Sequence, residues 1–222
     1  MTLALFDLDN TLLAGDSDHL WGEFLVDVGA VDADWFAREN DRHYRAYQEG
    51  SLDIEEYLAF ALRPLAEHDL QQLLEWRRQF VESKIQPIVL EPAQALVASH
   101  RRRGDTCLII TATNRFVTEP IAGLFGIEHL LATVPAQRDG RFTGGFQGQP
   151  TFREGKIAAL EDWAAAQGTD PWDAWFYSDS HNDLPLLERV REPVAVDPDP
   201  PLRERAEEYG WRIMSLRGGG EP

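Results

Sequence analysis

The sequence predicts an α/β fold: a Rossmann-like parallel sheet with helices on both faces, and an all-helical cap inserted after the first strand. Short apolar runs alternate with helical segments from residue 86 onwards, as in strands joined by crossover helices. Residues 15–85 show helical periodicity and no convincing strand. The length of 222 residues fits one compact domain with a substantial insertion.

These patterns predict the organisation of the chain. Residues 1–14 and 86–217 form the catalytic core, and residues 15–85 form the helical cap. The tail, residues 218–222, is rich in glycine and is expected to be disordered.

The first strand and the cap helices follow from local sequence. Leu3–Leu8 is a short apolar run ending in acid, which indicates a buried strand. The polar turn at residues 15–18 is expected to cap a helix over residues 20–28. Three further segments place apolar or aromatic residues at helical spacing, over 35–44, 54–61 and 70–80.

The second half alternates regularly between the two kinds of element. Asp139-Gly140 lies within residues 138–145 and is typical of a hairpin turn. Strands are predicted over 106–111, 129–134, 174–178, 193–197 and 211–215. Helices are predicted over 93–103, 116–125, 154–167, 184–190 and 203–209.

Charge and composition exclude several classes of function. The sequence holds 38 acidic against 21 basic residues, and its net charge of -17 repels nucleic acids and anionic lipid surfaces. The single cysteine, Cys107, excludes an internal disulfide and a cysteine-rich zinc site, and its apolar neighbours indicate a core residue. No apolar run approaches the roughly 20 residues of a membrane helix, and the N-terminus lacks a basic start. We therefore expect a cytoplasmic protein that binds neither nucleic acid nor membranes.

Polar side chains follow three of the predicted strands. Asp7 and Asp9 lie at the end of the first strand, Thr111 ends the second, and Asp179 and Asp183 follow the strand over 174–178. Ligands of open parallel sheets bind at the carboxyl ends of the strands. Four carboxylates at one edge repel one another unless a cation holds them, and hard oxygen ligands suit Mg²⁺. The constellation therefore predicts Mg²⁺-assisted phosphoryl transfer.

The same residues carry a resemblance to a known family. The run from Phe6 to Leu12, with Asp7 and Asp9 in it, resembles the first motif of the haloacid dehalogenase superfamily. Thr111 matches the second motif, Lys156 the third, and the run from Tyr177 to Asp183 the fourth. An isolated Asp-x-Asp-x-Thr is a weak signal, but four motifs in order, each at a strand end or helix start, are a strong one.

The resemblance implies catalytic roles for three residues. Asp7 would attack phosphorus and form an aspartyl-phosphate. Asp9 would protonate the leaving alkoxide and later deprotonate the hydrolytic water. Lys156 would neutralise the charge shared by nucleophile and phosphoryl group. An acid at position 9 is typical of the superfamily's phosphatases and phosphomutases and excludes a dehalogenase.

The resemblance also implies the binding residues. Mg²⁺ would be held by Asp7, by the backbone carbonyl of Asp9 and by Asp179. Asp183 and Asn182 would support these ligands from behind. Thr111 and the amide of Ala112 would bind the phosphate oxygens, together with Lys156.

A helical cap in the first position resembles the phosphoserine-phosphatase-like branch, whose caps favour small phosphorylated metabolites. Aligning the cap on that branch puts Ala61 where an arginine reads the carboxylate of phosphoserine. Arg63 is two positions further on, about 200° around a helix. Phosphoserine phosphatase therefore remains only an alternative.

The acids of the cap favour a different substrate. Asp16 and Asp18 either cap a helix or form an acidic rim that selects a cationic group. The wider sequence is similar to proteobacterial members of the branch that resemble histidinol-phosphate phosphatases, which makes L-histidinol phosphate the leading candidate. Asn114 and Arg115 are expected to begin a helix rather than to contact substrate. A phosphotransferase or phosphomutase remains an alternative, and the oligomeric state stays open.

Overall fold

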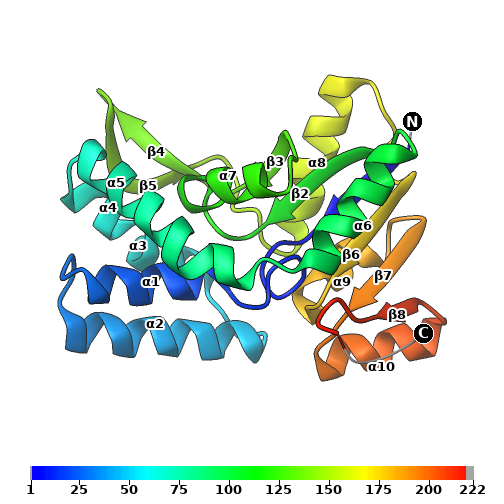
Figure 1. Ribbon diagram of the computed structural model, residues 1–222, viewed down its shortest axis with the longest axis horizontal. Helices are drawn as coiled ribbons and strands as arrows, with labels where there is room; N and C mark the ends of the chain where they lie inside the picture. The colour runs from blue at the N-terminus through cyan, green and yellow to red at the C-terminus, as the bar shows by residue number, and fades with distance from the viewer. Residues whose placement is uncertain (1, 219–222) are drawn as a thin grey trace.

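The computed structural model describes residues 2–218 and is built on a six-stranded parallel sheet of order β3-β2-β1-β6-β7-β8 (Figure 1). The predicted α/β fold is confirmed. The strands are β1 Leu3–Phe6, β2 Thr106–Thr111, β3 His129–Ala132, β6 Ala174–Ser178, β7 Glu192–Val196 and β8 Arg212–Met214.

Strand β1 lies in the middle of the sheet because all four of its side chains are apolar and buried. Successive side chains of a strand point to opposite faces. Leu3 and Leu5 join the hydrophobic cluster on one face, whereas Ala4 and Phe6 join the cluster on the other. A strand buried on both faces needs neighbours on both edges, and β2 and β6 provide them.

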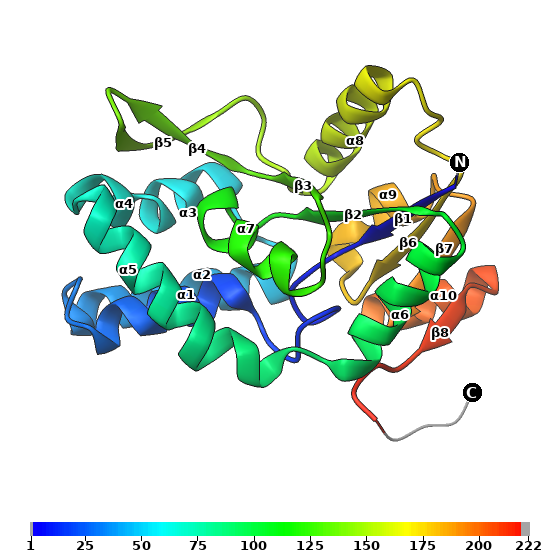
Figure 2. The ribbon, with the colours of Figure 1, turned by 45° about the horizontal axis from the view of Figure 1, so that its top comes forward.

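Helices cover both faces of the sheet (Figure 2). Helices α6 (Glu91–Arg102) and α7 (Arg115–Leu124) share the cluster of Phe6. The other face is covered by α8 Glu154–Gln167, α9 Leu184–Leu187 and α10 Pro200–Tyr209. The 3₁₀ turn η3, His181–Asp183, leads from β6 into α9. Helix α9 ends before the predicted residue 190.

A helical layer separates β1 from β2 in the chain and lies beside the sheet, on the left of Figure 1. Its α-helical path ends in the π-helix η1 (Val81–Ile85) and the 3₁₀ turn η2 (Gln86–Ile88), because Pro87 cannot donate to an α-helical ladder. The cap boundaries 15–85 remain a prediction. The helices are α1 Ser17–Asp27, α2 Ala33–Gln48, α3 Ile54–Ala61, α4 Arg63–Glu67 and α5 Leu70–Phe80.

The hairpin of β4 (Val134–Arg138) and β5 (Arg141–Gln147) leaves the sheet and packs against α3 and α4 (Figure 2). Asp139 and Gly140 both have positive φ, as the predicted turn requires. The predicted strand over 129–134 was too long at its C-terminal end. It stops at Ala132, and Val134 begins the hairpin.

Two further expectations concern single segments. Cys107 is a buried free thiol on β2, as its apolar neighbours predicted. No helix within residues 2–218 is long and apolar enough to cross a membrane. The predicted disorder of the tail concerns residues 219–222, which lie outside the described residues, as well as Gly218.

Candidate active site

The predicted site residues meet at the carboxyl edge of the three central strands. Phe6 of β1 is in register with Ile109 of β2 and Tyr177 of β6, so the residues that follow these positions emerge side by side. The Asp7 amide donates to the Tyr177 carbonyl at 2.9 Å and continues the ladder into the site. The parallel sheet therefore brings residues more than 100 positions apart to one edge.

Lys156 joins two of these carboxylates. Its ammonium lies 2.7 Å from an oxygen of Asp7 and 2.7 Å from one of Asp183. The Ser178 hydroxyl donates to Asp183 at 2.7 Å. All four side chains are buried, Lys156 at 2% exposure. Lys156 reaches the cluster because it lies in the first turn of α8, whose N-terminus packs near the sheet edge.

Burial and charge shift the pKa values of this group in a consistent way. Desolvation raises the pKa of Asp7 to about 7, even though the Lys156 charge opposes that rise. Burial alone would lower the pKa of Lys156, but the carboxylates of Asp183 and Asp7 outweigh it and raise that pKa above its ordinary value. Lys156 is therefore cationic at neutral pH.

The carboxylate of Asp9 is held by different partners. It accepts hydrogen bonds from the Ser17 amide at 2.6 Å and from the Thr113 hydroxyl at 2.7 Å. Desolvation raises its pKa to about 6, with the charge of Asp16 as the next cause. A pKa near neutrality suits a group that both gives and takes a proton. Thr113 was missed from the sequence, although its place two residues after Thr111 was a usable signal.

Asp179 and Asp7 form the part of the site that fits a metal ion. The Thr11 hydroxyl donates to Asp179 at 3.0 Å and leaves its second carboxylate oxygen without a protein partner in residues 2–218. Burial, followed by the charge of Asp7, raises the pKa of Asp179 well above its ordinary value. A cation between the two carboxylates would relieve this repulsion.

Within residues 2–218, no group of three or more Asp, Glu, His or Cys side chains is arranged to hold a metal ion by itself. The site expected here needs only two carboxylates and the Asp9 carbonyl, with water or phosphate in the remaining positions, as Mg²⁺ prefers. The oxygen donors of Asp7 and Asp179 fit that description. The binding of Mg²⁺ to this chain remains a proposal.

Thr111 lies at the same edge, 1% exposed, and its hydroxyl accepts a hydrogen bond from the Thr113 amide at 3.2 Å. Ala112, the other residue expected to bind phosphate, borders the cavity beside it. Asn182, in contrast, does not reach Asp179. It accepts from the Arg153 guanidinium and donates to the Tyr47 carbonyl.

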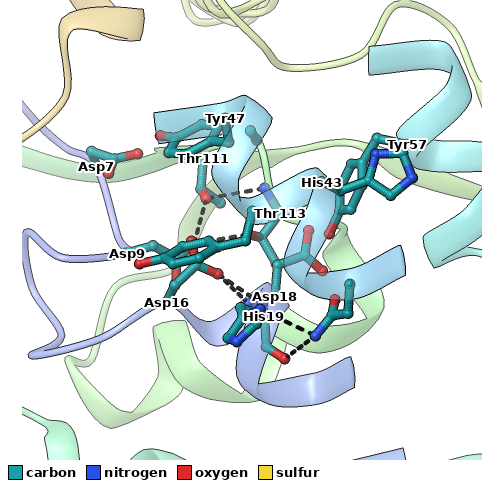
Figure 3. Close-up of a pocket in the computed structure, with 13 residues that line it drawn as sticks. Asp7, Asp9, Asp16, Asp18, His19, His43, Tyr47, Tyr57, Thr111 and Thr113 are labelled. Carbon is teal, nitrogen blue, oxygen red and sulfur yellow. Dashed lines mark hydrogen bonds between the residues drawn. The ribbon is translucent and has the colours of Figure 1, made fainter. Parts of the chain in front are cut away.

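A cavity opens from the carboxylates towards the helical layer. Figure 3 shows Asp7 and Thr111 towards one end of this group, and His43 and Tyr57 towards the other. Both cap acids of the sequence prediction border the cavity. The lining residues are Asp7, Asp9, Asp16, Asp18, His19, Asn40, His43, Tyr44, Tyr47, Tyr57, Thr111, Ala112 and Thr113.

Most of the cavity wall contributed by α2 was missed from the sequence. Asn40, His43, Tyr44 and Tyr47 recur at the spacing of one helix face. Polar aromatic residues at this spacing resemble an ordinary amphipathic helix, and Tyr44 was interpreted as part of that pattern. The mixture of polar groups on this helix face is the feature that distinguishes a cavity wall from an ordinary amphipathic helix.

The structure also locates the residues of uncertain role. Asp16 is the N-cap of α1, and Asn114 is the N-cap of α7, with Arg115 the first residue of that helix. Arg63 is 60% exposed, pairs with Glu67 at 2.6 Å and does not border the cavity. Neither does Ala61, so the cavity wall contains no arginine or lysine within residues 2–218.

The motifs, fold and site geometry agree with a comparison against family models. The model for haloacid dehalogenase-like hydrolases matches residues 4–188. The chain belongs to this family. The hydrolase class expected from the four motifs is therefore confirmed, and the family's phosphatases are known to use Mg²⁺.

Two curated members of the haloacid dehalogenase-like family align along almost the whole chain. A histidinol-phosphatase of Neisseria meningitidis serogroup C (strain 8013) is 44% identical over 219 residues, covering 97% of this chain and 99% of that protein. A phosphoserine phosphatase of Mycobacterium tuberculosis (strain ATCC 25618 / H37Rv) is 30% identical over 217 residues, covering 96% and 70%.

Solved structures of the family show the same fold. A protein of unknown function from Bordetella pertussis Tohama I is 45% identical, with a TM-score of 0.91 over 96% of this chain and 98% of that one. A substrate-bound phosphoserine phosphatase is 18% identical, with a TM-score of 0.72 over 97% and 93%. At that identity the likeness extends to the fold alone.

Proposed function

We propose that this protein is a Mg²⁺-dependent phosphomonoester phosphatase that works through an aspartyl-phosphate, with L-histidinol phosphate as its leading substrate. The observation that carries the chemistry is the contact between Lys156 and Asp7, buried beside Asp9 and Thr111. A nucleophile, a cation and an acid of near-neutral pKa lie together at this edge of the sheet, and the nucleophile and the acid border the cavity. Binding alone would need no nucleophile.

In the first half-reaction an oxygen of Asp7 attacks phosphorus and the bond from phosphorus to the ester oxygen breaks. Asp9 gives its proton to the departing alkoxide, so the alcohol leaves neutral. Thr111 and the Ala112 amide bind the phosphate oxygens, and Lys156 balances the charge that builds up between them and Asp7.

In the second half-reaction water attacks the phosphorus of the aspartyl-phosphate, and Asp9 takes the proton that the water loses. The bond between Asp7 and phosphorus breaks, which restores the free carboxylate and releases inorganic phosphate. Ser17 and Thr113 keep the Asp9 carboxylate directed into the cavity during both steps.

Mg²⁺ would be held by Asp7, the Asp9 carbonyl and Asp179, with Asp183 supporting Asp7 through Lys156. When bound, the ion would neutralise phosphate oxygens and lower the repulsion between phosphate and carboxylate. Asp183 orients Lys156 by direct contact, whereas Asn182 acts on the neighbouring backbone of the cap.

The charge of the cavity favours histidinol phosphate over phosphoserine. Asp16 and Asp18 add negative charge beyond the catalytic carboxylates, and no arginine or lysine of residues 2–218 borders the cavity to receive a substrate carboxylate. Histidinol phosphate carries an ammonium group and no carboxylate. The histidinol-phosphatase relative from Neisseria meningitidis supports the same choice, and with it a place in cytoplasmic histidine biosynthesis.

The test is Mg²⁺-dependent phosphate release from histidinol phosphate and phosphoserine measured side by side, with Asp7→Asn as control. We expect a strong preference for histidinol phosphate that the variant abolishes. A preference for phosphoserine would overturn the substrate assignment. Release without an added acceptor separates hydrolysis from the phosphotransferase or phosphomutase alternative, which needs a second substrate.

A further inference from the structure

The two cap acids of the cavity differ in what already binds them. One carboxylate oxygen of Asp16 accepts the amides of Asp18 at 3.0 Å and His19 at 2.8 Å. This is the N-cap interaction of α1, which satisfies two otherwise orphaned amides. Asp16 is therefore committed to the start of the helix and has its charge partly balanced there.

Asp18 makes no such capping interaction. It accepts no backbone amide and has no arginine, lysine or histidine nitrogen within 4 Å in residues 2–218. Its one polar partner is the Tyr57 hydroxyl, directed at the carboxylate in Figure 3. Desolvation raises its pKa to about 7, as it does that of Asp16, so the two acids differ in their contacts and not in this shift. A half-buried carboxylate with a single neutral partner lacks a cation, and a cation can reach it from the cavity that it borders.

The surroundings of Asp18 are those of a recognition site rather than of a second catalytic group. Tyr57 lies edge-on to His43, with ring centroids 5.2 Å apart, and His43 packs against Phe60 at 5.1 Å. Asp18, Tyr57 and His43 all border the cavity, on the side away from Asp7. Phosphate held at Asp7 therefore directs the alcohol half of a substrate towards this corner.

His43 supplies an independent sign that a ligand completes the corner. It is 3% exposed, and its Nε2 lies 3.0 Å from the Arg42 guanidinium. Because a guanidinium only donates, Nε2 accepts and the ring proton lies on Nδ1. Burial, and then the charge of Arg42, lower the pKa of His43 and keep the ring neutral. The Nδ1–H group has no hydrogen-bond partner in residues 2–218, although His43 borders the cavity.

We propose that Asp18, held in place by the Tyr57 hydroxyl, selects the substrate by binding a protonated amine on its alcohol half. The substrate class is a phosphomonoester of an amino alcohol, with a hydrogen-bond acceptor that reaches His43. Asp16 has a structural task in the helix. This inference rests on the proposed phosphatase function. It assigns the selection of the substrate amine to Asp18 and not to Asp16.

The experiment compares histidinol phosphate with 3-(imidazol-4-yl)propyl phosphate, which lacks only the amine. In the wild-type protein kcat/KM should be about 10- to 100-fold higher for the amine, as expected for a charge-assisted hydrogen bond. Asp18→Asn should remove most of this ratio. Asp34→Asn is the matched control, because it removes the same charge from an exposed position of the cap, and it should leave the ratio unchanged.

Tyr57→Phe tests the positioning role. It keeps the ring that packs on His43 and removes only the hydroxyl. We expect KM for the amine ester to rise about 3- to 10-fold with a smaller change for the amine-free ester, as for loss of one neutral hydrogen bond. A role in packing alone would change both esters equally or neither.

Several outcomes would overturn the inference while leaving the phosphatase intact. They are equal kcat/KM for the two esters in the wild type, an equal loss on both in Asp18→Asn, or a selective loss in Asp16→Asn instead. Should Asp18→Asn fail to fold, inhibition of the wild type by the two free alcohols gives the same answer. Histidinol must then bind about tenfold or more tightly than its amine-free counterpart. If Asp7→Asn retains activity, the phosphatase mechanism itself fails.

Discussion

Asn182 donates a hydrogen bond to the Tyr47 carbonyl at 3.0 Å and thereby joins the loop after β6 to the C-terminal end of α2. The same side chain accepts from the Arg153 guanidinium, which in turn donates to the Gly50 carbonyl. Asn182 is 3% exposed. Two residues of the core thus hold the end of the helix that forms one wall of the cavity.

Asn182→Ala is therefore expected to weaken substrate binding. Removing these bonds takes one hydrogen-bond partner from the Tyr47 carbonyl and one from the Arg153 guanidinium, and should lower the free energy of unfolding by about 1–3 kcal/mol. We expect a KM several-fold above wild type, because the cavity wall is less firmly held. Steady-state kinetics and urea unfolding measure the two effects.

The control for this prediction is Gln79→Ala, which removes a part-exposed side chain bonded to the exposed Glu75, far from this network, and should change neither quantity. Arg153→Gln should reproduce the rise in KM. Combining it with Asn182→Ala should add little, because both act through one network. Fully additive effects, or an unchanged KM in either variant, would contradict the link between core and cap.

The only two lysines of the sequence give a second, matched prediction. Lys156→Met leaves Asp7 and Asp183 buried without a counter-charge and should cost about 3–5 kcal/mol of stability. Lys84→Met breaks a part-exposed pair with Asp27 at 2.8 Å and should cost about 0–1 kcal/mol. Only the first should abolish phosphate release. Similar costs at both positions would mean that Asp7 and Asp183 take up protons when Lys156 is replaced, so that no unpaired charge is left in the buried cluster.

Packing between the first two helices of the cap depends on a glycine. A Cβ at Gly22 would lie 2.5 Å from the Asn40 side chain, which borders the cavity. Gly22→Ala should therefore displace Asn40 and lower the free energy of unfolding by about 1–3 kcal/mol. At Gly123 of α7 nothing lies within 4 Å, so Gly123→Ala should raise it by about 0.5–1 kcal/mol. Thermal unfolding of both variants checks the sign, and a neutral Gly22→Ala would show that α1 and α2 can separate freely.

The catalytic edge was predictable because each residue there marks the end of a strand. Asp7, Thr111 and Asp179 follow apolar runs that are strands for simple reasons of burial, and a parallel sheet aligns such ends. Lys156 was predictable from its motif at a helix start. Local sequence and topology therefore specify this half of the site.

The cap half was not predictable in the same way. Tyr57 and His43 come from different helices, and their meeting with Asp18 depends on how α1, α2 and α3 pack. Helix spacing assigns residues to a face but does not say whether that face covers core or cavity. The hairpin at Asp139-Gly140 shows the same limit, since its turn was predicted but its packing against α3 and α4 was not.

Metal removal gives a prediction about stability as well as activity. Chelation with EDTA should abolish phosphate release, and adding Mg²⁺ should raise the melting temperature, because the ion binds only the folded carboxylates. In Asp179→Asn this rise should be lost, whereas Asp173→Asn, on the opposite end of the same strand, should retain it. If adding Mg²⁺ leaves the melting temperature of the wild type unchanged, the metal site proposed between Asp7 and Asp179 is excluded.

The pH dependence of stability should expose the buried charge of Asp18. Its pKa is raised to about 7 by desolvation, against 3.8 for an ordinary aspartate, so the folded state binds more protons than the unfolded state between these pH values. Stability then falls as pH rises through this window, since the slope follows the difference in bound protons. Asp18→Asn carries no such charge at any pH. The variant should match the metal-free wild type near pH 4, gain stability relative to it up to about pH 7, and keep that gain at higher pH.

The measurement is a series of melting temperatures in EDTA from pH 4 to pH 8.5. Asp34→Asn serves again as the control, because it removes the same charge from an exposed position of the cap. A difference for Asp18→Asn that is constant with pH would mean that the carboxylate is solvated in the free protein. It would then need no cation from a substrate, and the selectivity of the cavity would have to come from elsewhere on its wall.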